Sequence, residues 1–298
     1  GFNCWSCKYD SFDLPVFQRP YSQCDCDICL SCTSRTYCKY QVVVEICLYH
    51  LLLCPVSGLY RLAVVSMYDY GISAQLEPVW RSLSVEQILD IMERTCGARM
   101  TFNYDCIGGV MQDLDKDFVK DVHALLDTLD KNVAEYKKIF TGNVIARNRM
   151  IGVGVLSRED AISAGITGPA GRASGWACDV RKTHPYSGYE KLKFEQVVRT
   201  EGDSMARFEN RLDEVLQSKG IIEQLIDCIP EGEYLAKVPR VLKLPVGRWF
   251  QLVEGCRGVF GVYIESDGGT SPLRLKLAPP CLPLANVVDH LTQGSKIA

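Results

Sequence analysis

The chain of 298 residues can hold one large domain or two ordinary ones, and an apolar content of 47% allows a substantial buried core. Lysine and arginine number 33 against 36 aspartate and glutamate residues, so the basic excess typical of nucleic-acid-binding proteins is missing and we expect no nucleic-acid partner. The longest apolar stretch, residues 42–56, is interrupted by Glu45, His50 and Pro55 and is shorter than the roughly 18–20 residues of a membrane span. We therefore expect no transmembrane helix, and no signal peptide because no basic-then-apolar leader follows Gly1.

Cysteine is concentrated at one end of the chain, where nine of the 15 cysteines lie within the first 54 residues. A secreted disulfide scaffold is usually shorter and spreads its cysteines through the fold, so a reducing compartment with possible metal chemistry is the simpler interpretation. Residues 1–63 show no steady period of two or 3.6, and we treat them as a separate Cys-rich segment of uncertain assignment. The nine cysteines are Cys4, Cys7, Cys24, Cys26, Cys29, Cys32, Cys38, Cys47 and Cys54.

Two helices are predicted in the middle of the chain. The first begins at Ser84, which forms a capping box with Gln87, and ends at Gly97. The second follows three aspartates at 113–117 and carries apolar residues at three- and four-residue spacing until Gly142. The apolar stripe of the second helix predicts core packing.

The next segments alternate short elements with a third, longer helix. Residues 144–155 mix β-branched residues with arginines, and Ser157 begins a short helix that ends at Gly165. We predict a loop over 165–175 and a long helix over 203–228.

The pattern changes to a period of two near the end of the chain. Residues 259–265 and 273–277 flank the turn residues Ser266-Asp267-Gly268-Gly269, which predicts a β-hairpin. The sequence therefore predicts a mainly α fold with small β elements.

Charged residues stand beside aromatic ones on a glycine-bearing loop: Arg172-Ala-Ser-Gly175 is followed by Asp179-Val-Arg-Lys182, Pro185-Tyr186 and Tyr189. Such a loop is expected where backbone approaches a partner and charges are paired or tuned. The residues alone leave two interpretations open, an internal salt-bridge network and a direct role near a redox site.

This run resembles a signature of the D subunit of NADH:quinone oxidoreductase (complex I) and of energy-converting [NiFe]-hydrogenase large subunits. Further landmarks stand in matching order, which makes coincidence improbable. They are Gly97-Ala-Arg-Met100, Gly108-Gly109-Val110 with Asp113, Gly152-Val-Gly154, Gly202-Asp203, Arg207 with Arg211, and Tyr263 to Gly268.

The resemblance implies a [NiFe]-hydrogenase large-subunit-like helical domain with a C-terminal β-hairpin over residues 64–298, with family segments missing at both ends. It implies a subunit, inactive alone, that receives electrons from a [4Fe–4S] cluster in a small Fe–S partner and helps form a quinone-reduction site. Quinone is then the substrate, and the chain binds no cofactor itself. The other implied partners are the remaining peripheral-arm subunits and the membrane-arm subunits. The implied location is peripheral, on the cytoplasmic face of a prokaryotic plasma membrane, or alternatively on the matrix side of the mitochondrial inner membrane.

The resemblance also assigns residues to the site. The family run Glu-Ala-Pro-Arg-Gly-Glu is degraded here to Glu254-Gly-Cys-Arg257-Gly-Val259, which makes Arg257 the best inherited catalytic candidate. A structural pairing of Arg257 in the hairpin is the alternative. The other catalytic candidates are Asp179, Arg181 and Lys182, and those near the partner's cluster or the quinone are Met111, Arg172 and Tyr186.

Departures from the family pattern keep two other functions open. Met111 replaces the titratable His of mitochondrial members, so a proton-coupling role at that position is expected to be absent. Cys26-Asp-Ile-Cys29 falls where hydrogenases bind nickel through a first C-x-x-C pair, so the first alternative is a [NiFe] hydrogenase large subunit with Cys26 and Cys29 as metal ligands. The second alternative is a non-catalytic scaffold subunit that retains the fold and has lost the site.

Overall fold

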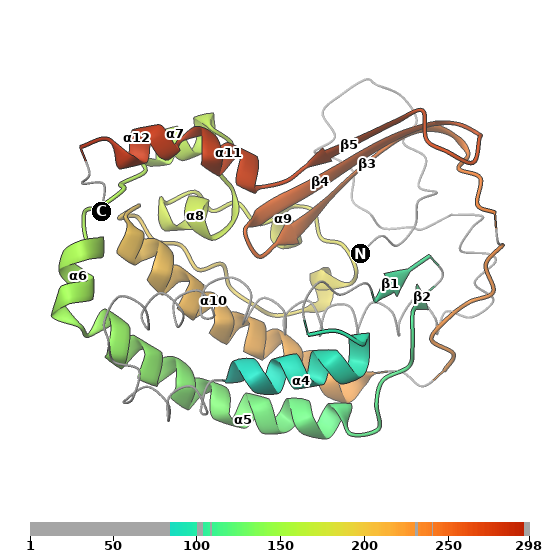
Figure 1. The fold of residues 1–298 in the computed structure, drawn as a ribbon, viewed down its shortest axis with the longest axis horizontal. Coiled ribbons are helices and arrows are strands. Elements are labelled where there is room, and N and C mark those ends of the chain that lie inside the picture. The colour runs from blue at the N-terminus through green and yellow to red at the C-terminus, as the bar shows by residue number, and fades with distance from the viewer. Residues whose placement is uncertain (1–83, 100–103, 108, 230–231, 240, 295–298) are drawn as a thin grey trace.

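A computed structural model shows a layer of long helices and a small antiparallel sheet with short helices between them (Figure 1). Within the described part of the chain, no helix is long and apolar enough to cross a membrane. The N-terminal segment 1–63, with Cys26 and Cys29, lies outside the described residues. The described residues are 84–99, 104–107, 109–229, 232–239 and 241–294.

Three helices form the helical layer and confirm the helix predictions. Helix α4 is Ser84–Cys96, α5 is Phe118–Tyr136, and α10 is Ser204–Leu225. A π-helical turn at Lys137–Thr141 extends α5, and a 3-10 turn at Ile226–Cys228 extends α10. Helix α5 packs against both α4 and α10.

An apolar cluster holds these helices together. The apolar residues of α5 recur at three- and four-residue spacing, so one face of the helix is buried, and Phe118 is only 1% exposed. Leu212 and Ile222 bring the matching face of α10 to the cluster. The predicted core role of the α5 stripe is therefore confirmed. Its α5 members are Phe118, Val122, Leu125, Leu126, Leu129, Val133 and Tyr136.

Short helices follow α5. Arg158–Ser163 forms α7, capped by the Ser157 side chain, as predicted. The predicted loop over 165–175 is wrong, because Gly168–Ala173 forms helix α8. Pro169 stands in the first turn of α8, where its fixed φ suits a helix. The Gly168-Pro169 pair is also typical of turns, so the sequence suggested a loop. The remaining short elements are α6 (Val144–Met150), α9 (Val180–Thr183), a 3-10 turn η3 (Tyr189–Lys191), α11 (Cys281–Asn286) and α12 (Val288–Thr292).

The main sheet has three antiparallel strands in the order β3-β4-β5. The predicted hairpin is confirmed as β4 (Gly258–Asp267) and β5 (Arg274–Ala278), with Ile264 opposite Leu275. Strand β3 (Val246–Gly255) was not predicted, and it pairs with β4 along its full length. A second, two-stranded pair consists of β1 (Asp105–Cys106) and β2 (Gly109–Val110).

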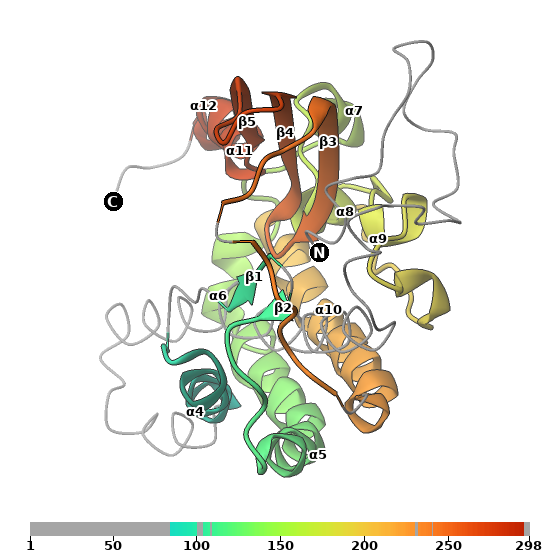
Figure 2. The same ribbon diagram turned by 90° about the vertical axis from the view of Figure 1, so that its right-hand side faces the viewer.

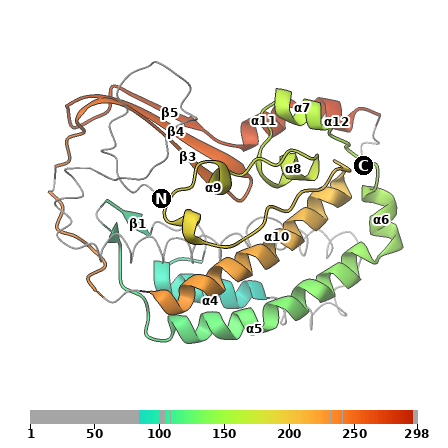
Figure 3. The ribbon, with the colours of Figure 1, turned by 180° about the vertical axis from the view of Figure 1, so that it is seen from behind.

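The short helices α8 and α9 lie between the sheet and α10, as the view from behind shows (Figure 3). In the side view the sheet and the helices α4 and α5 lie at opposite ends of the molecule (Figure 2). Helix α8 packs against α10 and β4, and α9 packs against β3. The charged loop of the sequence is therefore held at the junction of the two layers.

Candidate active site

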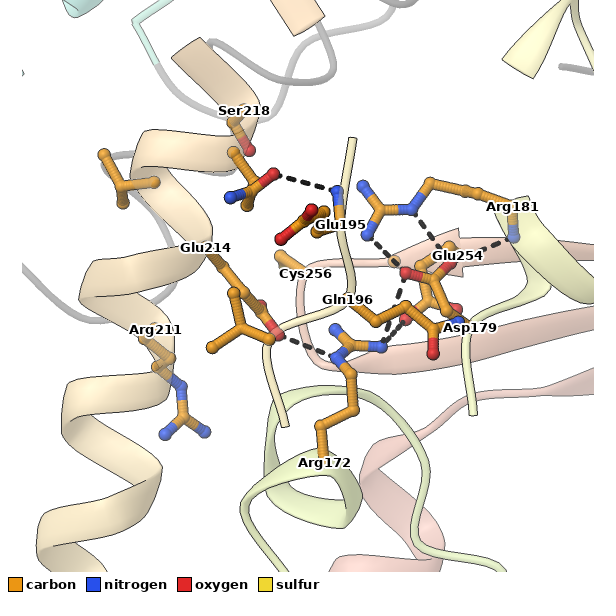
Figure 4. Close-up of a pocket in the computed structure, with 14 residues that line it drawn as sticks. Arg172, Asp179, Arg181, Glu195, Gln196, Arg211, Glu214, Ser218, Glu254 and Cys256 are labelled. Atoms are coloured by element: carbon orange, nitrogen blue, oxygen red, sulfur yellow. Dashed lines mark hydrogen bonds and ion pairs between the residues drawn. The ribbon is translucent and has the colours of Figure 1, made fainter. Parts of the chain in front are cut away.

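Arg172 on α8 ties three elements together at this junction (Figure 4). Its Nε donates to Glu214 Oε1 of α10 at 2.7 Å, and its Nη1 donates to Glu254 Oε1 of β3 at 2.8 Å. The same Nη1 donates to the carbonyl oxygen of Cys178 at 3.0 Å. Arg172 is 2% exposed, so these contacts lie in the interior of the protein.

Asp179 forms a second buried pair beside it. The Asp179 side chain caps α9 by accepting from the backbone N–H of Arg181 at 3.0 Å. Arg181 also donates from Nε and Nη2 to the two Asp179 oxygens at 2.9 and 2.6 Å, the two-bond geometry in which a guanidinium fits a carboxylate. The guanidinium of Arg181 lies 4.9 Å from the centre of the Phe194 ring. Asp179 is fully buried, and its charge is compensated locally.

Tyr186 and Glu254 connect the two pairs. The backbone N–H of Glu254 donates to the Tyr186 hydroxyl oxygen at 2.9 Å, and the N–H of Val180 donates to Glu254 Oε2 at 3.2 Å. Glu254 is 2% exposed. We call Arg172, Asp179, Arg181, Glu214 and Glu254 the ion-pair cluster.

The electrostatics of the cluster follow from burial and from these contacts. Burial works to raise the pKa of Asp179, but the hydrogen bonds and charge of Arg181 outweigh it and hold that pKa below its ordinary value. Burial raises the pKa of Glu254, with Arg172 opposing this effect. Burial also raises the pKa of Tyr186, so its hydroxyl keeps its proton at neutral pH. The cluster therefore combines fixed charges with a carboxyl group whose proton affinity is increased.

A small cavity of about 30 Å³ adjoins the cluster, enough for one or two water molecules. The strip of residues 195–197 covers it on one side and α10 on the other (Figure 4). Cluster residues and Cys256 contribute to its wall. The arrangement can hold water or a small polar group among oriented charges.

The structure brings four of the predicted site residues into contact and leaves the other three apart. Arg172, Asp179 and Arg181 belong to the ion-pair cluster, and the Tyr186 hydroxyl accepts a hydrogen bond from the backbone of its member Glu254. Lys182 is exposed, with its Nζ 4.0 Å from the centre of the Phe194 ring.

Lys182, Tyr186, Arg257 and Met111 are not part of the cavity wall. Arg257 is exposed at the turn between β3 and β4. Met111 is 57% exposed and directly follows β2. Within the described ranges no group of three or more His, Cys, Asp or Glu residues is arranged to hold a metal ion.

Two acidic members of the cluster were not predicted as site residues. Glu254 stands in the same degraded run as Arg257, and its place at the end of a strand could have indicated it. Glu214 carries no local signal, because it lies among other charged residues of α10 and meets Arg172 only through the tertiary fold. Both glutamates contact Arg172, which the motif did indicate as a site residue.

A close backbone contact positions the β3–β4 turn against α8. Gly168 has a φ of +71°, and a Cβ there would lie 2.4 Å from the Gly258 Cα. The N–H of Val259 donates to Thr167 Oγ1 at 2.9 Å. Only glycine allows this approach, which places Arg257 next to the start of α8.

The fold matches that of one chain in a solved respiratory membrane complex. A chain in the structure of the membrane-bound sulfane sulfur reductase, an archaeal respiratory membrane complex, aligns with a TM-score of 0.74 and 30% identity. The match covers 88% of this chain and 70% of that chain. The family model described as the 49 kDa subunit of respiratory-chain NADH dehydrogenase matches residues 77–244 and 237–298. The chain therefore belongs to the 49 kDa subunit family, which confirms the resemblance and the fold that it implied.

Individual relatives agree with the family. The C/D subunit of the NADH-quinone oxidoreductase of Bacteroides thetaiotaomicron is 53% identical over 213 residues, which are 72% of this chain and 40% of the relative. The D subunit of the same enzyme from Clostridium beijerinckii is 42% identical over 212 residues, which are 71% of this chain and 57% of the relative. The chain thus spans about half the length of the curated relatives it matches.

Proposed function

We propose that this chain is the part of a complex I-type NADH:quinone oxidoreductase that receives electrons from a [4Fe–4S] cluster in a small partner protein and helps form the quinone-reduction site. Family membership and the names of its relatives support this proposal. The chain acts as a subunit among peripheral-arm and membrane-arm partners and binds no cofactor directly. It is peripheral to the membrane, on the cytoplasmic face in a prokaryote, and the mitochondrial matrix side is the alternative.

The observation that carries the proposal is the ion-pair cluster beside a small cavity that charged side chains help to line. Five charged side chains from α8, α9, α10 and β3 are fixed by one another in the interior. Charges that are already oriented stabilise a charge that develops on a bound group, because the protein does not have to rearrange during the reaction. A quinone headgroup gains negative charge on reduction, so the fixed charges would act on a headgroup bound at the rim of the cluster, while the cavity of about 30 Å³ itself holds only water.

The residues have different proposed roles. Among the candidate site residues Arg257 and Lys182 are the exposed cations, and we assign them to contact a headgroup that enters from solvent or from a partner. Asp179, Arg181 and Arg172 act as positioning residues that hold α8, α9 and β3 together. Tyr186 retains its proton and can offer it as a hydrogen-bond donor.

The test uses the whole assembled complex. Arg257→Ala and Asp179→Asn are each expected to lower quinone reduction, while NADH oxidation with an artificial acceptor that bypasses the quinone site stays at the wild-type rate. Arg248→Ala is the matched control, because Arg248 is exposed and pairs with Glu265 away from the cavity. Unchanged quinone turnover in both site variants would contradict the proposal. Normal assembly of complexes that tolerate every cluster substitution would support the scaffold alternative.

The solved structure favours a second candidate acceptor. Its chain aligns with 88% of this one and belongs to a complex named for sulfane sulfur reduction. The same complex assayed with a polysulfide in place of quinone separates the two acceptors. Metal analysis of the full-length protein tests the [NiFe] hydrogenase alternative, since Cys26 and Cys29 would have to bind nickel.

A further inference from the structure

Strand β5 is an outer strand of the main sheet. Within the described part of the chain the strand order is β3-β4-β5, so β5 has a neighbouring strand on one side only (Figure 2). A strand carries backbone N–H and C=O groups toward both sides, and an edge strand leaves one row of them without a partner strand. Pro272 and Pro279 lack an N–H and flank β5, so they limit this edge to residues 273–278. The edge is a short template on which another extended segment can pair.

Three leucines at this edge are more than half exposed. The exposed fractions of Leu273, Leu275 and Leu277 are 64%, 53% and 54%. The register places Leu275 beside Ile264 and Leu277 beside Val262 of β4, and these two partners are each 8% exposed. Residues paired across strands lie on the same face of a sheet, so an apolar face that is covered at the central strand continues to the open edge. Exposed leucines on an edge strand favour association with another chain.

The other face of the same edge is basic. Arg274 and Lys276 alternate with the leucines and are exposed. Strand β5 has no acid, and the part of β4 opposite it, residues 261–265, has Glu265 alone. Glu265 lies opposite Arg274 and already pairs with Arg248 at 2.8 Å. Like charges placed opposite each other are unfavourable, so this edge disfavours pairing with a second copy of itself and favours a strand with carboxylates at alternate positions.

We propose that β5 binds an extended segment of another protein of the complex, in which apolar and acidic residues alternate, as a fourth strand of the sheet. Successive side chains of a strand point to opposite faces. The apolar residues of the segment therefore lie beside Leu275 and Leu277, and its carboxylates lie beside Arg274 and Lys276. The backbone row supplies hydrogen bonds to any extended segment, and the alternation of side chains selects the partner.

This inference rests on the proposed function only in that the chain works as a subunit with protein partners. Its experiments measure contacts and assembly rather than quinone turnover, so the two proposals fail separately.

The first experiment looks for the carboxylate beside Lys276 in the purified whole complex. A carbodiimide joins an amine to a carboxylate in contact with it, and peptide mass spectrometry identifies both residues. Lys276 is expected to crosslink to an acidic residue of another protein, within a segment of alternating apolar and acidic residues, and Lys276→Gln should remove that crosslink. Lys137 Nζ lies 2.5 Å from Asp213 Oδ1, so this pair should crosslink within the chain in both complexes and confirm the chemistry. Crosslinks of Lys276 confined to this chain, or none while the control forms, would overturn the proposal.

The second experiment measures how far the complex can be diluted before this chain dissociates from it. Leu275→Asn combined with Leu277→Asn should raise the dissociation concentration about tenfold or more, because the apolar contacts with the added strand are lost. Ile145→Asn is the matched control, since Ile145 is 52% exposed on α6, apart from β5 (Figure 1), and this variant should dissociate like the wild type. Urea unfolding of the full-length variants checks that the fold is intact. Wild-type dissociation of the double variant would overturn the proposal, and if the double variant fails to fold, the Lys276 crosslink decides alone.

Discussion

The apolar cluster of α4, α5 and α10 and the ion-pair cluster of α8, α9, α10 and β3 are both buried, but different forces hold them. Leu212 and Arg172 are each 2% exposed. Leu212 gains from leaving water, and its partners are interchangeable apolar surfaces. Arg172 loses its hydration on burial, and hydrogen bonds to particular oxygens of Glu214 and Glu254 replace the lost contacts with water. The apolar region can therefore tolerate similar substitutes, whereas the ionic region depends on the identity of each member.

The largest expected effect is that of removing the centre of the ion-pair cluster. Arg172→Ala leaves Glu214 and Glu254 in the interior without their shared cation, which should destabilise the fold by about 3–5 kcal/mol. Urea unfolding of the full-length protein measures this change. Arg248→Ala removes an exposed ion pair and should change stability little. Equal losses in the two variants would show that Arg172 is not the tie between the layers.

A cavity in the apolar cluster should have an effect of similar or smaller size. Leu212→Ala removes a side chain that α5 and α10 enclose, and it should cost roughly 2–5 kcal/mol through lost burial and the space left behind. Leu212→Met keeps the volume and should cost less than about 1.5 kcal/mol. The same urea titration measures both. A larger loss for Met than for Ala would contradict the view that volume alone matters in this region.

The two regions should also differ in their dependence on pH. Asp179→Asn removes a charge that accepts from Arg181, so a loss of about 1.5–3 kcal/mol is expected at pH 7. Because the folded-state pKa of Asp179 lies below the ordinary 3.8, its stabilisation is present above that value and disappears as the pH falls through the lower folded-state pKa. The difference between Asp179→Asn and wild type should therefore shrink in unfolding curves recorded below pH 3.8.

The control for this pH dependence is Leu212→Ala, whose stability difference should stay constant over the same range because no titrating group is removed. A constant difference for Asp179→Asn as well would mean that its carboxylate contributes no charge-dependent stability.

What could be predicted from the sequence follows the same division. The long helices were predictable because α5 and α10 repeat apolar residues every three or four positions over several turns. Strand β3 was not predictable. The residues of Val246–Gly255 do not alternate between buried and exposed positions along the whole strand, and the strand is stabilised by its pairing with β4. Helix α8 was hidden because Gly168, which allows a close contact with Gly258, suggests a turn when the sequence is interpreted alone.

The site was partly predictable for a related reason. Arg172, Asp179 and Arg181 stand within ten residues of one another, so the motif indicated them together. Glu214 and Glu254 are 42 and 82 residues from Arg172, and only the docking of α8 against α10 and β3 brings them to it. Arg257 was singled out from its motif alone, but it lies outside the cluster, on the turn.

The smallest effect distinguishes stability from function at the edge of the cluster. Lys182 is exposed, and its described contact is with the ring of Phe194, so Lys182→Met should cost no more than about 0.5–1 kcal/mol. Met keeps most of the chain length and removes the charge. If Lys182 only covers the ring, quinone turnover of the assembled complex should remain at the wild-type level. If turnover falls while urea unfolding is unchanged, the charge of Lys182 acts on the substrate, and the site extends from the buried cluster to its exposed rim.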